Sequence, residues 1–343
     1  MSERIVTVFG GSGFLGRHLI QKLAHDGALI RATVRRPESA GFLRPMGGVG
    51  QIALIQANVR DDESVARAIE GASEVVNLSG ILAERGRQRF AEVHARAPGR
   101  IARAAAAAGV DKLVHISAIG ADALANSAYA RSKAAGEQAL REAYPNATIL
   151  RPSVMFGPED DFFNKFSALA RISPALPVFF KMRQRPKFRI EGLYLMPEIE
   201  AGATRMQPVH VSDVAHAVQR VLSNGSGECD GKTYELGGPK VYSFRELMEL
   251  VARETQHKRL LVPVPYIAAD VLGFVAQLLP EPPFTLDQAK MLRADNVVAE
   301  DALTLDDLGI AASPAELILP TYLHRFRRAR TDSSAQTHSR ADV

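Results

Sequence analysis

A glycine-rich segment near the N-terminus constrains this chain more than any other feature. Gly10, Gly13 and Gly16 lie three residues apart, after the apolar run of residues 5–9 and at the start of a helical pattern. In a strand–turn–helix unit, the first glycine permits a tight turn, the second lets the backbone approach a pyrophosphate, and the third lets the helix pack closely. The helix N-terminus favours an anion. The segment predicts a dinucleotide site; the alternative is a structural glycine turn without a ligand.

Strand and helix patterns alternate through the first half of the chain. Repeated βα units of this kind predict an α/β fold with a Rossmann-type, doubly wound parallel sheet and right-handed crossovers. The expected strands cover residues 5–9, 29–34, 52–57, 74–78, 112–117 and 147–150, and the expected helices cover residues 16–25, 61–69, 90–108 and 127–144.

The rhythm changes after Pro152, where prolines and aromatic residues become frequent. We therefore predict a Rossmann core over residues 1–157 and a smaller C-terminal α/β lobe over residues 158–326. Residues 206–222 are expected to return to the core. The polar residues 327–343 are expected to form a disordered tail.

Local patterns predict how three C-terminal helices begin. Ser212 or Asp213 is expected to cap the helix of the returning segment. The spacing of Ser243 and Glu246 matches a capping box. The acidic run of residues 159–161 is expected to start a helix, because acids suit the positive end of the helix dipole.

Composition excludes several classes of protein and site. The net charge is only +4, there is no Trp, and no basic stretch is interleaved with aromatics, so nucleic-acid binding is not expected. A single cysteine, Cys229, excludes an internal disulfide and a cysteine-cluster metal site, and no metal site is predicted. The first strand begins too early for a signal or transit peptide, and no stretch reaches the roughly 20 apolar residues of a membrane span. We expect a cytoplasmic protein.

Tyr129 and Lys133 form the second chemical signal. A spacing of four residues places both side chains on one face of a helix. The ammonium is expected to favour the phenolate, so that Tyr129 acts as general acid or base, and to bind a nicotinamide ribose. Ser117 ends the strand that precedes this helix. We predict that these three residues are catalytic and face the nicotinamide, although the Tyr–Lys spacing also arises by chance in helices.

The end of the strand over residues 29–34 discriminates between cofactors. NAD sites usually place an acid there to bind the ribose hydroxyls. This chain instead has Arg35 and Arg36, whose guanidinium groups suit a 2′-phosphate. We predict NADP(H) in preference to NAD(H); the alternative is a pair of solvated arginines.

These motifs together resemble the short-chain dehydrogenase/reductase superfamily. Further segments resemble its extended and atypical branches, and within them the short-chain-dehydrogenase-like accessory subunit of respiratory complex I and its bacterial relatives. The resemblance covers roughly residues 4–326. The segments that carry it are residues 151–158 and 210–215 for the branches, and residues 76–81, 129–137, 156–164, 283–288 and 305–310 for the complex I subunit.

The resemblance implies a continuous set of nucleotide contacts. It places the pyrophosphate at the glycine turn, the adenine beside the third strand, and the nicotinamide beside the fourth to sixth strands. The implied residues are Gly10, Gly13, Phe14, Leu15 and Gly16 for the pyrophosphate; Asn58 and Val59 for the adenine; Leu78, Ser79 and Gly80 for the ribose and nicotinamide; Ser117, Tyr129 and Lys133 at the nicotinamide; and Pro152, Ser153 and Val154 in the covering loop.

One departure from the family pattern bears on turnover. Extended dehydrogenases generally carry a catalytic serine or threonine one position past Ser117, where this chain has Ala118. The segment from Ser117 to Tyr129 is also short for an extended enzyme. A site that binds the cofactor without turning it over is compatible with both differences.

Three functions remain open at this stage. The first is an NADP(H)-binding subunit associated with respiratory complex I in a structural or assembly role. The second is an NAD(P)-dependent oxidoreductase, epimerase or dehydratase that uses Tyr129 and Lys133 on an apolar or quinone-related substrate. The third is an accessory factor of ubiquinone biosynthesis.

Two segments are candidates for surface contact. Residues 262–279 are apolar around most of a helix, which suits a bilayer surface, a greasy pocket or a buried helix. Residues 179–189 mix phenylalanines with basic side chains. Both are compatible with peripheral contact at the cytoplasmic face of the inner membrane.

Overall fold

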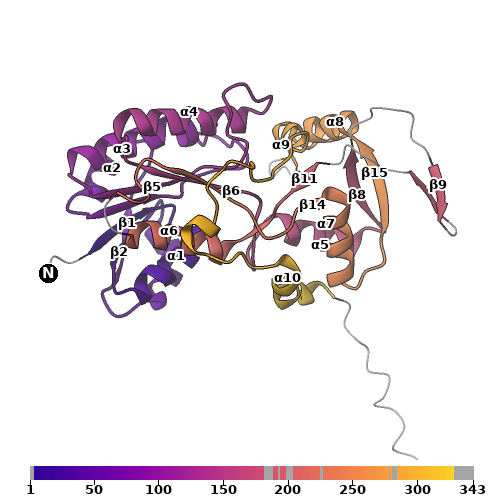
Figure 1. Ribbon diagram of the computed structural model, residues 1–343, viewed down its shortest axis with the longest axis horizontal. Coiled ribbons are helices and arrows are strands. Elements are labelled where there is room, and N and C mark those ends of the chain that lie inside the picture. Colours follow the sequence, from indigo (N-terminus) through magenta and orange to yellow (C-terminus); the bar gives the residue numbers. More distant parts are fainter. Residues whose placement is uncertain are drawn as a thin grey trace, which may run out of the picture.

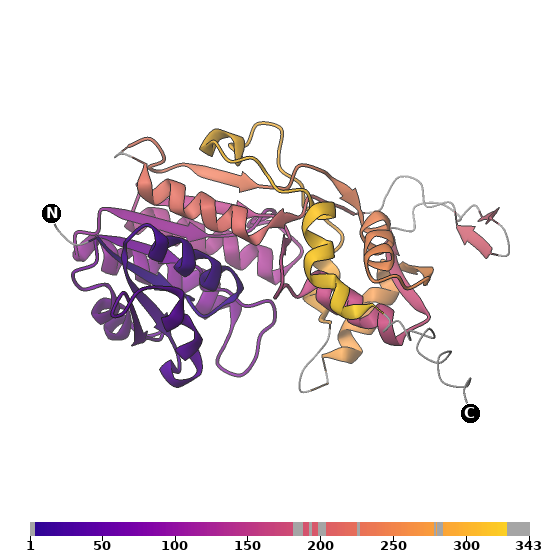
Figure 2. The same cartoon turned by 90° about the horizontal axis from the view of Figure 1, so that it is seen from below.

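Two lobes lie side by side along the long axis of the molecule (Figures 1 and 2). The computed structural model describes residues 4–180, 188–191, 194–197, 204–224, 227–277, 279 and 284–327. The expected tail beyond residue 327 and residues 181–187 of the basic segment lie outside these ranges. The larger lobe holds the N-terminal half of the chain.

A seven-stranded parallel sheet forms the larger lobe, which confirms the predicted fold class. Six strands match those expected from the sequence, while the seventh, β13, comes from the second half of the chain and pairs with β6. The strand order is β13-β6-β5-β4-β1-β2-β3. The strands are β1 (Ile5–Phe9), β2 (Leu29–Val34), β3 (Ile52–Gln56), β4 (Glu74–Asn77), β5 (Lys112–Ile116), β6 (Thr148–Pro152) and β13 (Thr233–Leu236).

Helices cover both faces of this sheet. On one face lie α2 (Asp62–Ile69), α3 (Ala97–Ala107) and α4 (Ala128–Ala143), and on the other lie α1 (Phe14–His25) and α6 (Val211–Ser223) (Figure 1). The strands are buried on both sides, so Val6 and Val8 join one apolar cluster while Phe9 joins the other. The strand order reverses between β1 and β4, and ligands of such sheets bind beyond the carboxyl ends of the strands at this point.

The smaller lobe has a separate apolar core. Phe156, Phe163, Phe244 and Leu319 are fully buried in it. Its helices are α5 (Phe162–Ile172), α7 (Phe244–Glu254), α8 (Tyr266–Ala276), α9 (Leu286–Met291) and α10 (Ala315–Leu323), beside the parallel pair β8 (Ala175–Phe180) and β15 (Leu260–Pro265). Among the helices of the described ranges, none combines the length and apolar character needed to cross a bilayer.

The remaining elements are short. They are η1 (Pro37–Met46), η2 (Ala91–Arg96), β7 (Met155–Phe156), β9 (Phe188–Glu191), β10 (Tyr194–Pro197), β11 (Arg205–Met206), β12 (Val209–His210), β14 (Tyr242–Ser243), η3 (Asp306–Leu308) and η4 (His324–Phe326).

Two local predictions need correction. The helix expected over residues 90–108 begins with the π-helical turn η2, because Pro98 has no N–H to continue the α-helical ladder to the His94 carbonyl. The cap expected at Ser212 or Asp213 is also wrong. His210 occupies the N-cap of α6 without a side-chain bond, and the Asp213 carboxylate accepts hydrogen bonds from Ser313 instead.

The other two predicted helix starts are confirmed. Ser243 and Glu246 form a reciprocal capping box at α7. Asp160, in the predicted acidic run, accepts the Phe163 N–H at 2.6 Å at the start of α5. Both caps join residues three apart in the sequence, whereas at α6 the carboxylate of Asp213 is taken up by Ser313, a distant partner that local spacing does not show.

Candidate functional site

The glycine turn between β1 and α1 is fixed by close backbone packing. Gly10 has a φ of +81°, and a Cβ on it would lie 3.1 Å from the Leu78 carbonyl group. A Cβ on Gly16 would lie 2.4 Å from the carbonyl oxygens of Gly10 and Gly11. The approach at Gly16 is closer than a side chain allows, and the positive φ at Gly10 strains any residue with a Cβ, so the fold itself favours glycine at both positions. A Cβ on Gly11, which the sequence analysis did not assign, would lie 2.9 Å from Ile20 Cδ1.

Gly13 differs from its neighbours in what surrounds it. It is the N-cap of α1, and a Cβ there would meet only the Gly10 carbonyl oxygen, at 3.2 Å, and otherwise open space. The first turn of α1 has no side-chain cap and no acid, so its N–H groups remain available to an anion. The side chain of Leu15 is buried in the core, so this residue can contact a ligand only through its backbone. The backbone of Phe14, the preceding residue, can contact the ligand in the same way.

Arg35 and Arg36 extend from the carboxyl end of β2. Both residues are exposed, and within the described ranges no ion pair or hydrogen bond holds either guanidinium group. The nearest acid along the chain, Glu38, lies in the first turn of η1. The strand end therefore presents unpaired positive charge.

Asn58 and Val59 follow β3, the neighbour of β2. The Asn58 side-chain oxygen accepts hydrogen bonds from the backbone and side chain of Arg60, both at 3.2 Å. The Val59 carbonyl accepts from Arg100 Nη1 at 2.9 Å. The segment predicted to flank an adenine is thus held in one conformation.

The loop after β4 is held by two buried side chains. Asn77 Oδ1 accepts the Ser79 N–H at 3.0 Å, and His94 Nε2 accepts the Ile81 N–H at 2.9 Å. This fixes the predicted segment Leu78, Ser79 and Gly80 beside the glycine turn, since Leu78 also touches Gly10.

Ser117, Tyr129 and Lys133 come together beyond β4 and β5. Lys133 Nζ donates to the Ile116 carbonyl at 3.1 Å and lies 5.9 Å from the Tyr129 ring centroid. A Cβ on Gly80 would lie 3.7 Å from Lys133 Nζ, so this loop borders the same space. The Ser117 hydroxyl is buried without a partner. Tyr129 is half-buried, and its hydroxyl makes no hydrogen bond within the described part of the chain. Such groups suit a polar ligand.

Burial shifts the pKa values of Tyr129 and Lys133. It raises the pKa of Tyr129 to about 12. It lowers the pKa of Lys133 to about 8, against the opposing charge of Glu137. The expected stabilisation of the phenolate by Lys133 is therefore not found in this state, because desolvation of the phenol dominates its pKa.

His94 supports the site without carrying charge. It stacks on Phe90, with ring centroids 5.2 Å apart, and meets the Tyr129 ring edge-on at 5.1 Å. Burial, followed by the charge of Lys133, lowers the pKa of His94 to about 2. Its Nε2 accepts from Ile81, so the neutral ring carries its proton on Nδ1 and donates to Ser132 Oγ at 3.1 Å. The sequence analysis missed this residue.

Asn296, from the second half of the chain, positions the predicted covering loop. Its side-chain oxygen accepts from Ser153 Oγ at 2.6 Å and from the Val154 N–H at 3.0 Å. Pro152 ends β6, and its carbonyl accepts the Ile119 N–H at 3.1 Å. The loop over residues 152–154 is thus fixed from both lobes.

Asp287 of α9 caps the helix that bears Tyr129. Its carboxylate accepts from the Ala128 N–H at 2.7 Å, the Ser127 hydroxyl at 2.8 Å and the Tyr129 N–H at 3.0 Å. A carboxylate at this position also suits the helix dipole. No sequence signal links residues so far apart, and the sequence analysis named Asp287 only within a family segment.

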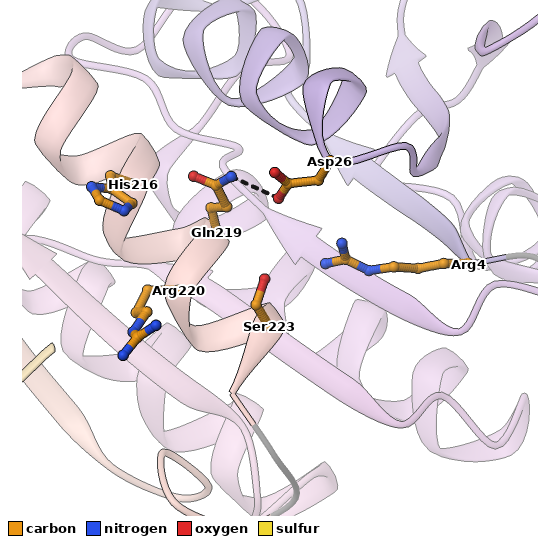
Figure 3. Close-up of a pocket in the computed structure, with 6 residues that line it drawn as sticks. All are labelled: Arg4, Asp26, His216, Gln219, Arg220 and Ser223. Atoms are coloured by element: carbon orange, nitrogen blue, oxygen red, sulfur yellow. Dashed lines mark hydrogen bonds between the residues drawn. The ribbon is translucent and has the colours of Figure 1, made fainter. Parts of the chain in front are cut away.

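A hollow of about 410 Å³ lies at the other end of the strands (Figure 3). It is lined by Arg4, Asp26, His216, Gln219, Arg220 and Ser223. Arg4 already pairs with Glu74, and Gln219 donates to Asp26 at 2.6 Å. The C-terminal ends of α1 and α6 border it, and their partial negative charge disfavours phosphates. This hollow therefore does not suit a nucleotide.

The residues present fit a dinucleotide. They combine a backbone cradle at Gly13, cations without a partner among the described residues at the end of β2, and the unpartnered buried hydroxyl of Ser117 near Lys133. In the part of the chain that the structure describes, no three His, Cys, Asp or Glu side chains gather as metal ligands would.

Comparison with known proteins identifies similar chains. The model of the NAD dependent epimerase/dehydratase family matches residues 6–237. The chain is 32% identical over 320 residues to "NADH dehydrogenase [ubiquinone] 1 alpha subcomplex subunit 9, mitochondrial" of Dictyostelium discoideum, covering 91% of this chain and 82% of the relative.

Two solved structures share the fold. Citrobacter triphenylmethane reductase complexed with NADP(H) has a TM-score of 0.68 at 19% identity, covering 92% of this chain and 99% of its own. Thermus thermophilus UDP-glucose 4-epimerase in complex with NAD has a TM-score of 0.62 at 19% identity, covering 94% and 98%.

Proposed function

Because the chain belongs to the NAD-dependent epimerase/dehydratase family, we propose that it binds NADP(H) at the carboxyl ends of its strands and serves complex I in a structural or assembly role. The observation that carries the nucleotide part is the open cradle at Gly13, beside uncapped N–H groups and two unpaired arginines. The complex I part is supported by the relative's name and by alignment along most of both chains.

Arg35 and Arg36 support a preference for NADP(H) over NAD(H). A 2′-phosphate would give these exposed guanidinium groups the partner that they lack, with bidentate geometry available to each. The solved structures of this fold carry either cofactor, so the preference rests on this chain's own residues.

The residues of the far end suit holding a nicotinamide riboside. Lys133 can donate to ribose hydroxyls, and the Ser117 and Tyr129 hydroxyls can bond to the ligand. When bound, the nicotinamide supplies a hydride donor or acceptor. Tyr129 holds its proton firmly at neutral pH, and Ala118 adds no hydroxyl to polarise a carbonyl. Both features favour retention of the cofactor over its turnover.

We place the protein in the cytoplasm, at the cytoplasmic face of the membrane that holds complex I.

The enzymatic alternative rests on the meeting of Tyr129 and Lys133, and the ubiquinone-biosynthesis alternative rests on the fold alone. A bound nucleotide that stabilises the fold by mass action suffices for the structural role.

The first experiment purifies the protein from its own membranes and cytosol and identifies what accompanies it. Stoichiometric NADPH together with complex I subunits is expected. Freely exchanging nucleotide on a protein without respiratory partners would reject the subunit role.

A variant pair tests the cofactor preference. Replacing both Arg35 and Arg36 by Ala is expected to weaken NADPH binding by about tenfold to hundredfold while leaving NADH binding unchanged, because the loss of one charged hydrogen bond to the 2′-phosphate from this pair costs about 1.5–3 kcal/mol. Arg103→Ala, an exposed arginine on α3, is the control. Equal loss of both nucleotides would contradict the preference.

A further inference from the structure

His115 of β5 is a buried histidine that lies beside Asn77 of β4, at the carboxyl end of the sheet. Both residues are buried, and they are partners in the parallel register of the two strands. Their side chains therefore lie on the same face of the sheet, with Asn77 Nδ2 and His115 Nδ1 3.1 Å apart. His115 thus contacts the side chain that holds the loop after β4.

The loop after β4 determines the direction of this hydrogen bond. The Ser79 N–H can only donate, so the Asn77 atom that lies 3.0 Å from it is the amide oxygen. The amide NH2 of Asn77 therefore donates to His115 Nδ1, and the ring carries its proton on Nε2. Burial, followed by the charge of Lys133, lowers the pKa of His115 to about 3. The ring is thus neutral, and Nδ1 remains an acceptor.

Two neutral histidines of opposite tautomer hold the loop over residues 78–81. His94 accepts the Ile81 N–H through Nε2 and carries its proton on Nδ1. His115 accepts through Nδ1 and acts on the Ser79 N–H by way of Asn77. A protonated imidazole could do neither, because both of its nitrogens are donors.

This loop borders both ends of the proposed nucleotide site. A Cβ on Gly10 would lie 3.3 Å from the Ser79 nitrogen, and a Cβ on Gly80 would lie 3.7 Å from Lys133 Nζ. A displacement of the loop would therefore change its packing against the glycine turn and against Lys133 together.

Stability alone does not account for an imidazole at position 115. Within the described ranges, its Nε2–H is buried without a partner. An unsatisfied buried donor lowers stability, and an apolar side chain of similar size would avoid this cost. The bond that the ring does make, through Nδ1 to Asn77, is therefore its distinctive contribution.

We propose that His115 is a positioning residue for nucleotide binding. By accepting from Asn77, it keeps the amide oxygen toward Ser79 and so holds the loop over residues 78–81 in the orientation that binds NADPH. A flipped amide would bring two donors together at the Ser79 N–H, and the loop would lose this anchor. The inference rests on the proposed function and adds to it a residue that acts through Asn77.

Two variants of nearly equal shape, His115→Asn and His115→Leu, test this proposal in the full-length protein. Both remove the ring, so they share the loss of packing. Only the Asn side chain can place an oxygen near the position of Nδ1 and accept from Asn77. We expect His115→Leu to bind NADPH about threefold to tenfold more weakly than His115→Asn, because one neutral hydrogen bond is lost. Hydrogen exchange of the Ser79 N–H should also be faster in His115→Leu.

Val114→Ala is the control for loss of stability. Val114 precedes His115 and is fully buried on the opposite face of β5, in the other apolar cluster. Its truncation is expected to lower the free energy of unfolding without changing NADPH affinity or the exchange of the Ser79 N–H. Nitrogen NMR of wild-type protein with labelled histidines should show the proton on Nε2 of His115 and on Nδ1 of His94.

Equal NADPH affinity and equal Ser79 exchange in the two His115 variants would overturn the inference. A proton on Nδ1 of His115 would overturn it as well, because the ring could not then accept from Asn77. Wild-type protein that binds no NADPH would instead reject the proposed function. In that case the exchange of the Ser79 N–H would still decide whether His115 anchors the loop.

Discussion

The two ends of the proposed nucleotide site are built differently. The pyrophosphate end consists of backbone. At Gly10 and Gly16 the chain packs so closely that an added Cβ would crowd neighbouring carbonyl groups. The nicotinamide end consists of side chains held by residues from both lobes, including His94, Asn296 and Asp287. The comparison teaches that one end is settled by local sequence, whereas the other depends on the assembly of the whole chain.

We expect the largest effect from a substitution that disrupts the backbone of the pyrophosphate end. Gly16→Ala would place a Cβ 2.4 Å from two carbonyl oxygens, so we expect a loss of about 3 kcal/mol in the free energy of unfolding, measured in urea, and no NADPH binding.

Gly13→Ala sharpens the same test, because its Cβ would meet only the Gly10 carbonyl oxygen, at 3.2 Å. We expect the free energy of unfolding to fall by less than about 1 kcal/mol and NADPH affinity to fall about a hundredfold. Gly41→Ala, whose Cβ would meet nothing within 4 Å, serves as the control. Similar nucleotide affinity in the two Ala variants would show that no phosphate lies at Gly13.

The next largest loss of NADPH affinity is expected from a substitution of Lys133, at the nicotinamide end. Lys133→Met is expected to weaken NADPH binding by about tenfold at neutral pH, because a charged donor is lost. In the wild type, affinity should fall as the pH rises through about 8, the pKa to which burial lowers Lys133. Measurements of NADPH affinity at pH values on both sides of 8 test this expectation. If Lys133→Met kept the wild-type pH profile, the profile would belong to another group.

The same shift predicts how stability changes with pH. The folded-state pKa of Lys133, about 8, lies below its ordinary value of 10.5, so between these values the unfolded state binds more protons. The free energy of unfolding should therefore rise with pH from about 8 to about 10, relative to Lys133→Met. Above pH 10 the raised pKa of Tyr129 acts in the opposite direction, since only the unfolded tyrosine ionises there.

Asp287→Ala tests whether the second lobe positions the side-chain end. Loss of the cap on α4 should cost about 1–2 kcal/mol of stability and weaken NADPH binding severalfold. Ser243→Ala removes the cap of α7, away from the site, and should lower stability without changing affinity. If both variants bound NADPH like the wild type, the cap would be structural only.

The smallest effect is expected for Tyr129→Phe. Its hydroxyl makes no hydrogen bond within the described residues, so stability should be unchanged, and NADPH affinity should fall by only about twofold to fivefold through the loss of one neutral hydrogen bond to the ligand. Association with complex I, measured by co-purification, should persist. A substrate whose reduction collapses in this variant would instead support the enzymatic alternative.

The contrast between the ends also explains what sequence could predict. The glycine turn, the strands and the capping boxes depend on neighbours in sequence, so their spacing was sufficient. Tyr129 and Lys133 were found because four residues make one helical turn. His94, Asn296 and Asp287 were missed as supports, because a buried histidine or a distant carboxylate has no local pattern. The raised pKa of Tyr129 likewise follows from burial, which spacing does not report.

The cap that Asp287 places on α4 has a consequence for the order of folding. Its hydrogen bonds join residues 158 to 160 positions apart, so this cap, unlike the local one that Ser127 gives the same helix, is completed only when the last part of the chain is in place. Contacts of such separation form late, after the entropy of closing a long loop has been overcome. A nascent chain that stops before residue 287 contains the glycine turn, both arginines and Lys133, but it lacks the carboxylate that holds the first turn of α4. Under the proposed function, NADPH affinity would therefore report whether the second lobe has docked against the first.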